Sequence, residues 1–360
     1  MDYTSDEQQS VYTVLVTGAN SGLGFSTCCR LIDEFLHLRP QTQTLHLIIT
    51  TRSSSKNKDT QTRLSAHLQK TLQKAEKSTP GISQVLATRI RISGERVDLY
   101  RIHVLICNAG IGGWKGLNWP SAIWSMLTDW KHSCTYPTYK LGFVGSVAPQ
   151  GSEEKEQQLG EVFTANVFGH YLLVHALAPL MKGSNSQEPG RVIWISSIEA
   201  YSHAFNPEDL QALTSDAAYD IADLPLVLWY AMLLAQYIAR WLGSPWHPVS
   251  SYLGAVSSVW LSLTPFSSLS NQETNEGKAK WASSTDVFGN ERVVRTEVGG
   301  WGWGGKVGEK ADGKMRLSAN RWRGQEDVTK ESREEFEVLG QRVWREMEEL
   351  RVTWDKRLQG

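Results

Sequence analysis

The chain has 360 residues, which is enough for one large domain with an extension or for two domains, and its 41% hydrophobic content supports a substantial core. Its 37 Lys and Arg residues balance 38 Asp and Glu residues, so the net charge of -1 gives no overall attraction to nucleic acid or to an anionic membrane. The polar, acidic first ten residues predict no secretory signal. The four cysteines lack the spacing of a metal site, which favours a reduced, intracellular setting and predicts no bound metal.

A glycine-rich turn follows the first apolar run of the chain. Residues 11–16 predict a strand, residues 17–24 (TGANSGLG) predict the turn, and a helix-compatible segment comes next. The first glycine allows a tight turn, and the other two leave backbone N–H groups open at a helix N-terminus, where the helix dipole favours an anion such as a pyrophosphate. The glycines are four and then two residues apart, which departs from G-x-G-x-x-G. The predicted phosphate-binding loop comprises Gly18, Asn20, Ser21, Gly22, Leu23 and Gly24.

An arginine follows the predicted second strand at residues 45–51. In a doubly wound fold, this strand end faces the adenosine ribose, where an acidic side chain favours NAD and an arginine accommodates the 2′-phosphate of NADP. Because no Asp or Glu stands between Leu45 and Asn57, Arg52 favours NADP. A solvated surface arginine is the alternative interpretation.

Residues 56–77 predict a surface helix with one narrow apolar stripe, formed by Leu64, Leu68 and Leu72. The segment is basic, but it has no interleaved aromatic residues, so a nucleic-acid patch is disfavoured. We therefore expect no nucleic-acid partner.

Two further strands are predicted before residue 108. Residues 85–99 contain a third strand that ends at 97–99, and residues 103–107 form a fourth that leads into Asn108, Ala109 and Gly110. Only three residues separate these strands, whereas parallel neighbours need a crossover of about a dozen or more. The sequence therefore predicts that a connecting helix is missing here.

In the middle of the chain, the sequence predicts an irregular segment followed by regular elements. Residues 114–150 are rich in Trp, Tyr, Pro and Gly and predict a long irregular loop. Residues 160–182 predict an apolar helix, and residues 191–197 a fifth strand. His170 and His175 on this helix are five residues apart, which does not suit a metal pair, so we expect them to pack in the core or at its rim.

The TGxxxGxG turn and the NAG at 108–110 resemble those of the short-chain dehydrogenase/reductase family, whose members bind NAD(P) on a Rossmann-like doubly wound parallel sheet. The resemblance implies that Asp98 meets the adenine and that Asn108, Ala109 and Gly110 lie beside the cofactor. It also assigns the catalytic roles. Asn166 would order a proton-relay water, Ser197 would hold the substrate carbonyl and Tyr219 would donate the proton.

One catalytic residue of the family pattern is missing. The family has Tyr-x-x-x-Lys, in which the Lys lowers the pKa of the Tyr, but Asp223 stands four residues after Tyr219. No Lys occurs between Lys182 and Lys278. Asp220 and Asp223 are like charges to a phenolate and would raise the pKa of Tyr219. The Pro-Gly turn that follows a sixth strand in the family is also missing, so we expect weak or no catalysis.

Several segments resemble, more specifically, the fungal 3-keto-steroid reductases, which use NADPH in sterol C-4 demethylation. These segments are NVFGHYLL, WISSIEA, NPEDLQAL, SLTP and TEVGGWGWGGK. The resemblance covers most of the chain, with two apparent gaps, one between Leu99 and Ile102 and one just after Tyr219. The gaps indicate internal deletions, through genuine loss or through an incorrectly spliced gene prediction.

Three hypotheses follow. The first is an NADP-dependent reductase of a 3-keto sterol. The second is a catalytically inactive cofactor-binding or scaffold protein of a sterol-synthesis complex. The third is a reductase of a related polycyclic ketone. A sterol enzyme of this kind would be intracellular and associated with the endoplasmic reticulum membrane.

Residues 224–242 form the most apolar stretch of the chain. At ~1.5 Å per residue, the stretch is marginal for spanning a hydrocarbon core of ~30 Å. Pro225 and Arg240 favour a membrane-lying helix or a buried lid helix over a true span.

The tail changes composition. Residues 271–320 predict a poorly regular segment, and residues 326–358 predict a charged amphipathic helix that docks on the main domain, with a coiled coil as the alternative. We expect an incomplete Rossmann domain at 1–223, an apolar segment at 224–270 and an extension at 271–360.

Overall fold

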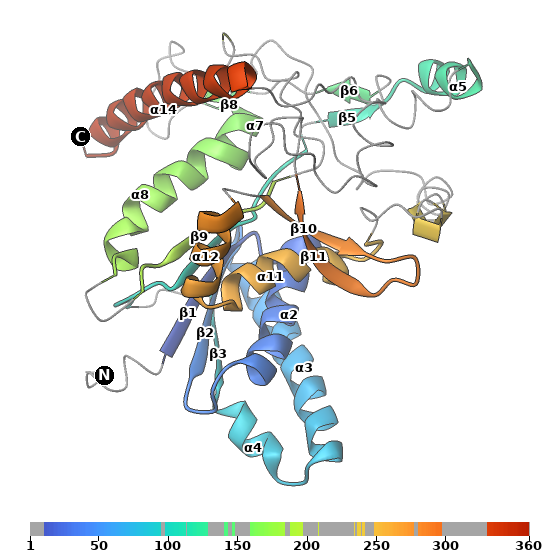
Figure 1. The fold of residues 1–360 in the computed structure, drawn as a ribbon, viewed down its shortest axis with the longest axis vertical. Coiled ribbons are helices and arrows are strands. Elements are labelled where there is room, and N and C mark those ends of the chain that lie inside the picture. Colours follow the sequence, from blue (N-terminus) through green and yellow to red (C-terminus); the bar gives the residue numbers. More distant parts are fainter. Residues whose placement is uncertain are drawn as a thin grey trace.

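The structure is a computed structural model, and it describes residues 11–94, 98–112, 114–128, 140–142, 146–147, 159–183, 188–196, 208, 234, 236–238, 240–241, 248–276, 280–296 and 330–359. Its centre is one parallel sheet with the strand order β3-β2-β1-β4-β9 (Figure 1). The strands are β1 (Val11–Thr17), β2 (Thr44–Thr50), β3 (Ile90–Ser93), β4 (Val104–Cys107) and β9 (Arg191–Trp194). The chain returns to the middle of the sheet after β3, so the predicted doubly wound fold is confirmed.

Helices cover both faces of this sheet. On one face, Val14 and Val16 of β1 pack with α2 (Gly22–Leu38), α3 (Ser54–Ser78) and α11 (Val256–Leu263). The stripe of Leu64, Leu68 and Leu72 on α3 is buried there, as predicted. On the other face, Leu15 and Leu105 pack with apolar side chains of α8 (Gly169–Met181). Both faces of the sheet are therefore covered and shielded from water, which explains why the strands are continuously apolar rather than alternating between apolar and polar residues.

The connection between β3 and β4 differs from the prediction. The third strand is Ile90–Ser93, so placing its end at residues 97–99 was wrong. β3 and β4 are also not neighbours, because β2 and β1 lie between them. The described residues of the connection, 94 and 98–103, contain no helix. Leu99 and Ile102 of this connection pack in the same apolar cluster as α8, so they add to the cover of that sheet face.

Regular elements occupy two segments that the sequence predicts as irregular. Residues 114–150 contain β5 (Trp114–Leu117), α5 (Trp119–Thr128), β6 (Lys140–Gly142) and β7 (Ser146–Val147). Residues 271–320 contain the end of α12 (Phe266–Glu276) and the hairpin of β10 (Lys280–Thr285) and β11 (Glu291–Thr296). Both predictions of irregular structure were therefore wrong, because short hairpins leave only a weak periodic signal. The remaining described elements are α4 (Ile82–Ala87), β8 (Leu159–Gly160), α7 (Glu161–Phe163), the π-helical turn η2 (Thr164–Phe168), α10 (Ser251–Gly254) and α14 (Lys330–Gln359).

The predicted C-terminal helix is confirmed as α14. Met347 is buried, and Val343, Leu350 and Trp354 pack with it against Phe163, Phe168 and Tyr171. The ring of Trp354 meets that of Phe168 edge-on at 5.9 Å. The apolar stripe of α14 thus docks on the helical segment that carries α8 (Figure 1), as the sequence predicts, rather than forming a coiled coil.

Only six residues of the apolar stretch 224–242 are described, at positions 234, 236–238, 240 and 241, and all six are helical. Arg240 is buried, and its guanidinium lies over the ring of Tyr237 at 4.9 Å. Within the described residues, no helix has the length and apolar character that a membrane crossing requires.

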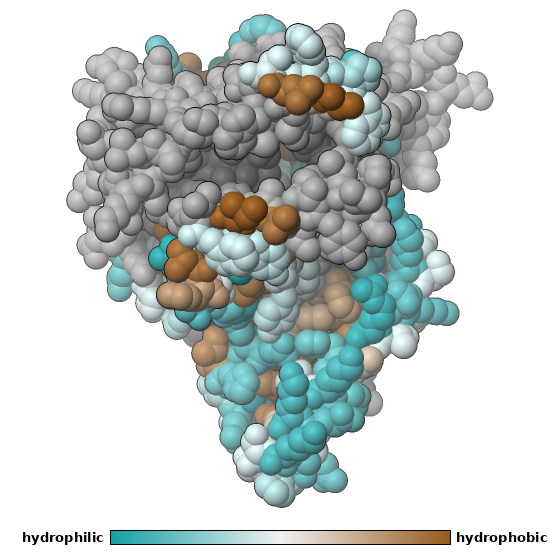
Figure 2. Space-filling view, turned by 90° about the vertical axis from the view of Figure 1, so that its right-hand side faces the viewer, coloured by the Kyte–Doolittle hydropathy of each residue, from teal (hydrophilic) through white to brown (hydrophobic). Residues whose placement is uncertain are grey.

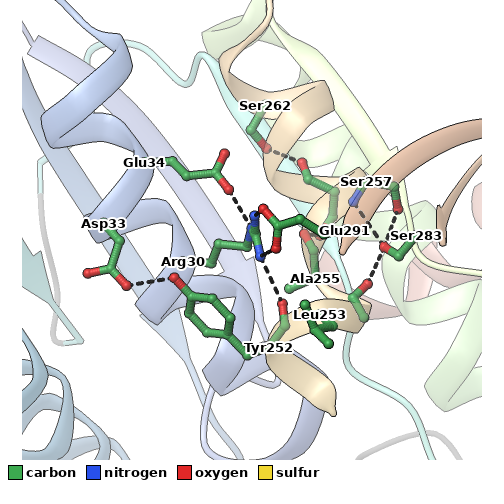
Figure 3. A network of polar contacts seen from close by, with 12 residues as sticks. Arg30, Asp33, Glu34, Tyr252, Leu253, Ala255, Ser257, Ser262, Ser283 and Glu291 are labelled. Atoms are coloured by element: carbon green, nitrogen blue, oxygen red, sulfur yellow. Dashed lines mark hydrogen bonds and ion pairs between the residues drawn. The ribbon is translucent and has the colours of Figure 1, made fainter. Parts of the chain in front are cut away.

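A buried arginine joins the C-terminal elements to α2. The Arg30 side chain is 5% exposed and lies between the carboxylates of Glu34 on α2 and Glu291 on β11 (Figure 3). Its guanidinium makes two hydrogen bonds to Glu291, one of them at 2.7 Å, and a longer one of 3.4 Å to the Tyr252 carbonyl. Nearby, the Tyr252 hydroxyl donates to Asp33 at 2.8 Å. This network fixes α10 and the hairpin on the outer side of α2.

A second ion pair joins α2 to α3 and makes stability depend on pH. His67 lies 3.0 Å from both carboxylate oxygens of Asp33, and this contact, with a smaller one from Cys29, raises the pKa of His67 to about 10. Burial alone would raise the pKa of Asp33, but the hydrogen bonds from His67, Thr71 and Tyr252 outweigh it and lower that pKa.

We expect the His67 contribution to be complete below about pH 6.5, the unfolded pKa of histidine, and to be lost as the pH rises to about 10. At the acid end it should fall as Asp33 protonates, below the ordinary pKa of Asp. Urea unfolding of the wild type and His67→Gln across this range measures the effect. Their stability difference should shrink between about pH 6.5 and 10. A constant difference would contradict the assignment.

Candidate active site

The predicted phosphate-binding loop lies at the carboxyl end of β1, between the strand and α2. Gly18 and Gly22 have φ angles of +66° and +53°, in the left-handed region that favours glycine. Gly24 has no room for a side chain, because an added Cβ would lie 2.4 Å from both the Gly18 carbonyl oxygen and the Asn108 Nδ2. Glycine is therefore required at these positions for different causes. At Gly18 and Gly22 the cause is the backbone conformation, and at Gly24 it is close packing.

The N-terminus of α2 suits an anion. Ser21 is the N-cap in extended conformation, and within the described chain its side chain caps no helix N–H group and the first turn carries no acidic residue. Ser21 and Gly22 are exposed, and no described atom lies within 4 Å of a Cβ added at Gly22. Helix N-terminal N–H groups that no side chain caps, with the positive end of the dipole, fit a pyrophosphate.

The NAG segment packs directly against this loop. The Thr17 hydroxyl oxygen accepts the backbone N–H groups of Asn108 and Ala109, both at 2.9 Å. The Asn108 side chain donates to the Thr17 carbonyl at 3.0 Å and to the Gly18 carbonyl at 3.4 Å. An added Cβ at Gly18 would lie 2.7 Å from the Ala109 Cα. The ends of β1 and β4 are thus locked together.

Asn166 lies in η2, where the helix widens for one π-helical turn. Its side chain accepts the Ile111 N–H at 2.7 Å and donates to the Ile111 carbonyl at 3.0 Å. A Cβ added at Gly110 would lie 3.1 Å from the Asn166 Oδ1. The structure therefore places Asn166 against the NAG segment, and π-helical turns of this kind occur mostly at functional sites.

Two residues that the sequence interpretation did not assign to the site, His170 and Arg63, also contact these segments. His170 is buried, with its Nε2 2.8 Å from the Thr17 hydroxyl and its Nδ1 3.3 Å from the Asn166 carbonyl. Arg63 on α3 donates to the Asn20 carbonyl at 2.9 Å, and its guanidinium lies 4.1 Å from the Phe25 ring centroid. Core packing was the prediction for His170, and only its position four residues after Asn166 pointed to a shared helix face.

The remaining predicted site residues are less closely tied to this group. Arg52 is exposed just beyond the end of β2. Asp98 is exposed in the β3–β4 connection, five residues after β3 ends. Leu23 approaches α10, since a Cβ added at Gly254 would lie 3.4 Å from it. Ser197 and Tyr219 lie outside the described residues.

Curated relatives align with nearly the whole chain. The 3-keto-steroid reductase of Aspergillus fumigatus is 37% identical over 432 residues, covering 96% of this chain and 94% of that protein. The 3-keto-steroid reductase of Gibberella zeae is 34% identical over 447 residues, covering 95% and 94%. Both aligned spans exceed the 360 residues of this chain, so these relatives have internal segments that the chain lacks.

No protein-family model matches the chain. Among solved structures, a menthone neomenthol reductase from Mentha piperita is 14% identical, with a TM-score of 0.37 over 71% of this chain and 95% of that one. Identity above 30% over almost the full length of two curated relatives is decisive. The chain belongs to the 3-keto-steroid reductase family.

Proposed function

We propose that this chain binds NADPH and acts on the 3-keto group of a sterol intermediate in the C-4 demethylation step of sterol biosynthesis. The observation that carries the proposal is the uncapped N-terminus of α2 beside the Thr17–Asn108 hydrogen bond, with Asn166 bonded to Ile111 just beyond the NAG segment. In a chain that is 37% identical to a 3-keto-steroid reductase, this arrangement supports a dinucleotide cofactor whose pyrophosphate lies at the helix N-terminus.

The described residues fit the cofactor. The N–H groups at Gly22 and Leu23 would hold the pyrophosphate, and exposed Arg52 would meet the adenosine 2′-phosphate that distinguishes NADP from NAD. Asp98 would meet the adenine, and Asn108 would line the nicotinamide side. The bound cofactor would supply a hydride for the C-3 carbonyl carbon.

The chain's own residues would handle the proton. Ser197 would donate a hydrogen bond to the carbonyl oxygen, Tyr219 would donate the proton to it, and Asn166 would support the relay that returns a proton to Tyr219. Asp223, however, stands at the position where the family pattern has the lysine that lowers the pKa of the catalytic tyrosine. We therefore expect cofactor binding with weak turnover.

The test uses the purified full chain. NADPH binding is measured by fluorescence titration and NADPH oxidation with a 3-keto sterol, for the wild type and for Asp223→Lys, which restores Tyr-x-x-x-Lys. We expect saturable NADPH binding and little oxidation by the wild type. A lack of binding would overturn the cofactor proposal, and oxidation at a rate within the usual enzyme range of ~1–10³ per second would overturn the proposed impairment.

A second function is favoured by the missing lysine alone. A chain that binds NADPH but never turns over, even as Asp223→Lys, would act as a scaffold of a sterol-synthesis complex. The transcript sequence separates this case from a faulty gene prediction, because a longer message that encodes Tyr-x-x-x-Lys would restore the enzyme. The relatives' longer aligned spans make this comparison informative.

We also propose that the chain associates with the endoplasmic reticulum membrane through exposed apolar side chains on one side of the molecule. α5 presents a face with Trp124 70% exposed and Leu127 79% exposed. The β10–β11 turn presents Phe288, which is 86% exposed, and Figure 2, which faces this side, shows separate hydrophobic patches. Short elements that carry Trp, Phe and Leu suit the membrane interface.

Described residues of the apolar stretch 224–242 lie near the β10–β11 turn. A Cβ added at Gly289 would lie 3.0 Å from an Arg240 guanidinium nitrogen, which places Arg240 beside this turn. Buried Arg240 turns inward there, while Leu234 and Trp241 stay exposed. This arrangement supports the membrane-lying interpretation of the stretch, in which the arginine does not enter lipid.

Replacing the exposed apolar side chains of α5 with serine should weaken binding of the protein to phosphatidylcholine vesicles. Each large apolar side chain that is buried contributes about 1.5–3 kcal/mol, so Trp124→Ser with Leu127→Ser should lower the partition coefficient by roughly tenfold or more. Cosedimentation measures it. Leu38→Ser is the control, because Leu38 is 64% exposed at the end of α2. Equal partitioning of the double variant and the wild type would contradict a lipid-facing α5.

A further inference from the structure

His170 bridges two separate halves of the candidate site. It is the second residue of α8, directly after η2, and its ring is buried with its centroid 5.7 Å from that of the Trp194 ring of β9. One ring nitrogen faces Thr17 at the end of β1, and the other faces the backbone carbonyl of Asn166. The ring therefore links the strand that leads into the phosphate-binding loop to the π-helical turn that carries Asn166.

The hydrogen bonds around Thr17 determine the protonation of this ring. A threonine hydroxyl has two lone pairs and one proton. Both lone pairs of the Thr17 oxygen are used, because it accepts the N–H groups of Asn108 and Ala109. Its proton is left for an acceptor, and His170 Nε2 at 2.8 Å is nearer than the Ile106 carbonyl at 3.3 Å. His170 Nε2 must therefore accept rather than donate.

The opposite ring nitrogen agrees with this assignment. The Asn166 carbonyl can only accept, so His170 Nδ1 must carry a proton to bond with it at 3.3 Å. A ring protonated on Nδ1 and bare on Nε2 is a neutral imidazole in one tautomer. Protonation of Nε2 would place its N–H against the Thr17 oxygen, whose lone pairs are already filled, and would break the bridge.

We propose that His170 is a positioning residue of the cofactor site, whose neutral Nδ1-protonated ring holds the Thr17 end of the phosphate-binding loop in register with Asn166. This inference rests on the proposed cofactor binding. It gives the histidine a role through Thr17 and Asn166, with no contact to the cofactor.

The surroundings keep this ring neutral. Burial lowers the pKa of His170, and the hydrogen bond to the Asn166 carbonyl opposes it less strongly. Burial also raises the pKa of the neighbouring Cys107 thiol on β4 to about 12, so this thiol carries no charge near neutral pH. The other titratable groups of α8, Tyr171 and His175, contact Glu348 of α14. Trp194 of β9 and Thr17 of β1 are uncharged at neutral pH.

The test compares one replacement that keeps a hydrogen-bond acceptor with another that keeps an aromatic ring but has no acceptor. His170→Gln offers an amide oxygen to the Thr17 hydroxyl, whereas His170→Phe keeps a ring of similar shape and offers none. NADPH affinity is measured by fluorescence titration on the full chain. We expect His170→Phe to raise the Kd about tenfold, in line with the loss of one buried hydrogen bond worth ~1.5 kcal/mol, and His170→Gln to restore most of the affinity.

Two further measurements separate positioning from simple packing. Tyr171→Phe is the control, because it removes a hydrogen bond to Glu348 on the same helix and should leave the Kd unchanged. In the cofactor-free protein, 15N spectra of the wild type should show one ring, absent from His170→Gln, in the Nδ1-protonated form. Below about pH 6, the wild type should lose more NADPH affinity than His170→Gln, which cannot titrate.

Each result decides a separate point. If the wild type itself fails to bind NADPH, the proposed function falls and the inference falls with it. If the wild type binds and His170→Phe binds equally well, only the role of His170 is overturned. A Nε2-protonated ring in the spectrum, or identical pH profiles for the wild type and His170→Gln, would also overturn it.

Discussion

Gly24→Ala should abolish or strongly weaken NADPH binding. The added methyl group would lie 2.4 Å from the Gly18 carbonyl oxygen and from the Asn108 Nδ2, so α2 must move away from the turn that leads into it. Neither contact can give way easily, because one partner is backbone and the other is held by hydrogen bonds to the Thr17 and Gly18 carbonyls. Overpacking of this kind costs about 1–3 kcal/mol, and in binding each 1.4 kcal/mol is a tenfold change in Kd.

Fluorescence titration with NADPH, together with urea unfolding, measures both consequences. Gly340→Ala is the matched control, because Gly340 lies in α14 with no described atom within 4 Å of an added Cβ. The control should keep the wild-type Kd and gain up to about 1 kcal/mol of stability from the better helix former. Wild-type affinity in Gly24→Ala would show that the cofactor does not bind over this turn.

Arg30→Met should destabilise the protein by up to about 3 kcal/mol, at the lower end of the effect of breaking a buried ion pair, because Glu34 and Glu291 are 23% and 42% exposed and water partly screens the carboxylates left behind. The Arg30 side chain is 5% exposed and bonds both Glu34 and Glu291, so its loss leaves two carboxylates close together without a cation. The same guanidinium lies 5.0 Å from the Tyr252 ring centroid, and that contact is lost as well. We expect the hairpin of β10 and β11 to separate from α2 first.

Urea unfolding of Arg30→Met and of Arg342→Met measures the difference. Arg342 also pairs with two carboxylates, those of Glu208 and Glu346, but its side chain is 42% exposed, so its loss should change stability little. Adding Glu291→Met and Glu34→Met to Arg30→Met should recover stability, because apolar groups then replace the unpaired charges. Equal midpoints for Arg30→Met and the wild type would show that the C-terminal elements are not held by this network.

The sheet and its glycine-rich turn follow directly from local sequence. Continuous apolar runs at β1, β2 and β4 predicted buried parallel strands, and the TGxxxGxG spacing predicted the turn between β1 and α2. The leucines at every fourth position of α3 and the apolar stripe of α14 predicted the buried faces of these two helices equally directly. These signals are periodic and short-range, so one segment carries each of them whatever lies elsewhere in the chain.

The hairpins and the position of β3 could not be read in this way. β3 has four residues, and its pairing with β2, from Leu45 with Ile90 onward, fixes its position at Ile90–Ser93, before the residues 97–99 that the sequence favoured. The hairpin at 280–296 has only a weak periodic pattern in its sequence. Its position is fixed by its packing against α11 and by the ion pair between Glu291 and Arg30. Tertiary contacts override local preference for such short strands.

The sequence by itself determined the family, the doubly wound sheet, the loop from Gly18 to Gly24 and the absence of a lysine after Tyr219. Only the tertiary structure decided that Thr17, Asn108, Asn166 and His170 form one hydrogen-bonded group, in which the histidine, buried as predicted, also links Thr17 to Asn166. The physical reason is that a motif fixes the spacing along one strand or helix. The partners of a buried polar atom come from other strands and helices, and only the folded chain brings them within hydrogen-bond distance.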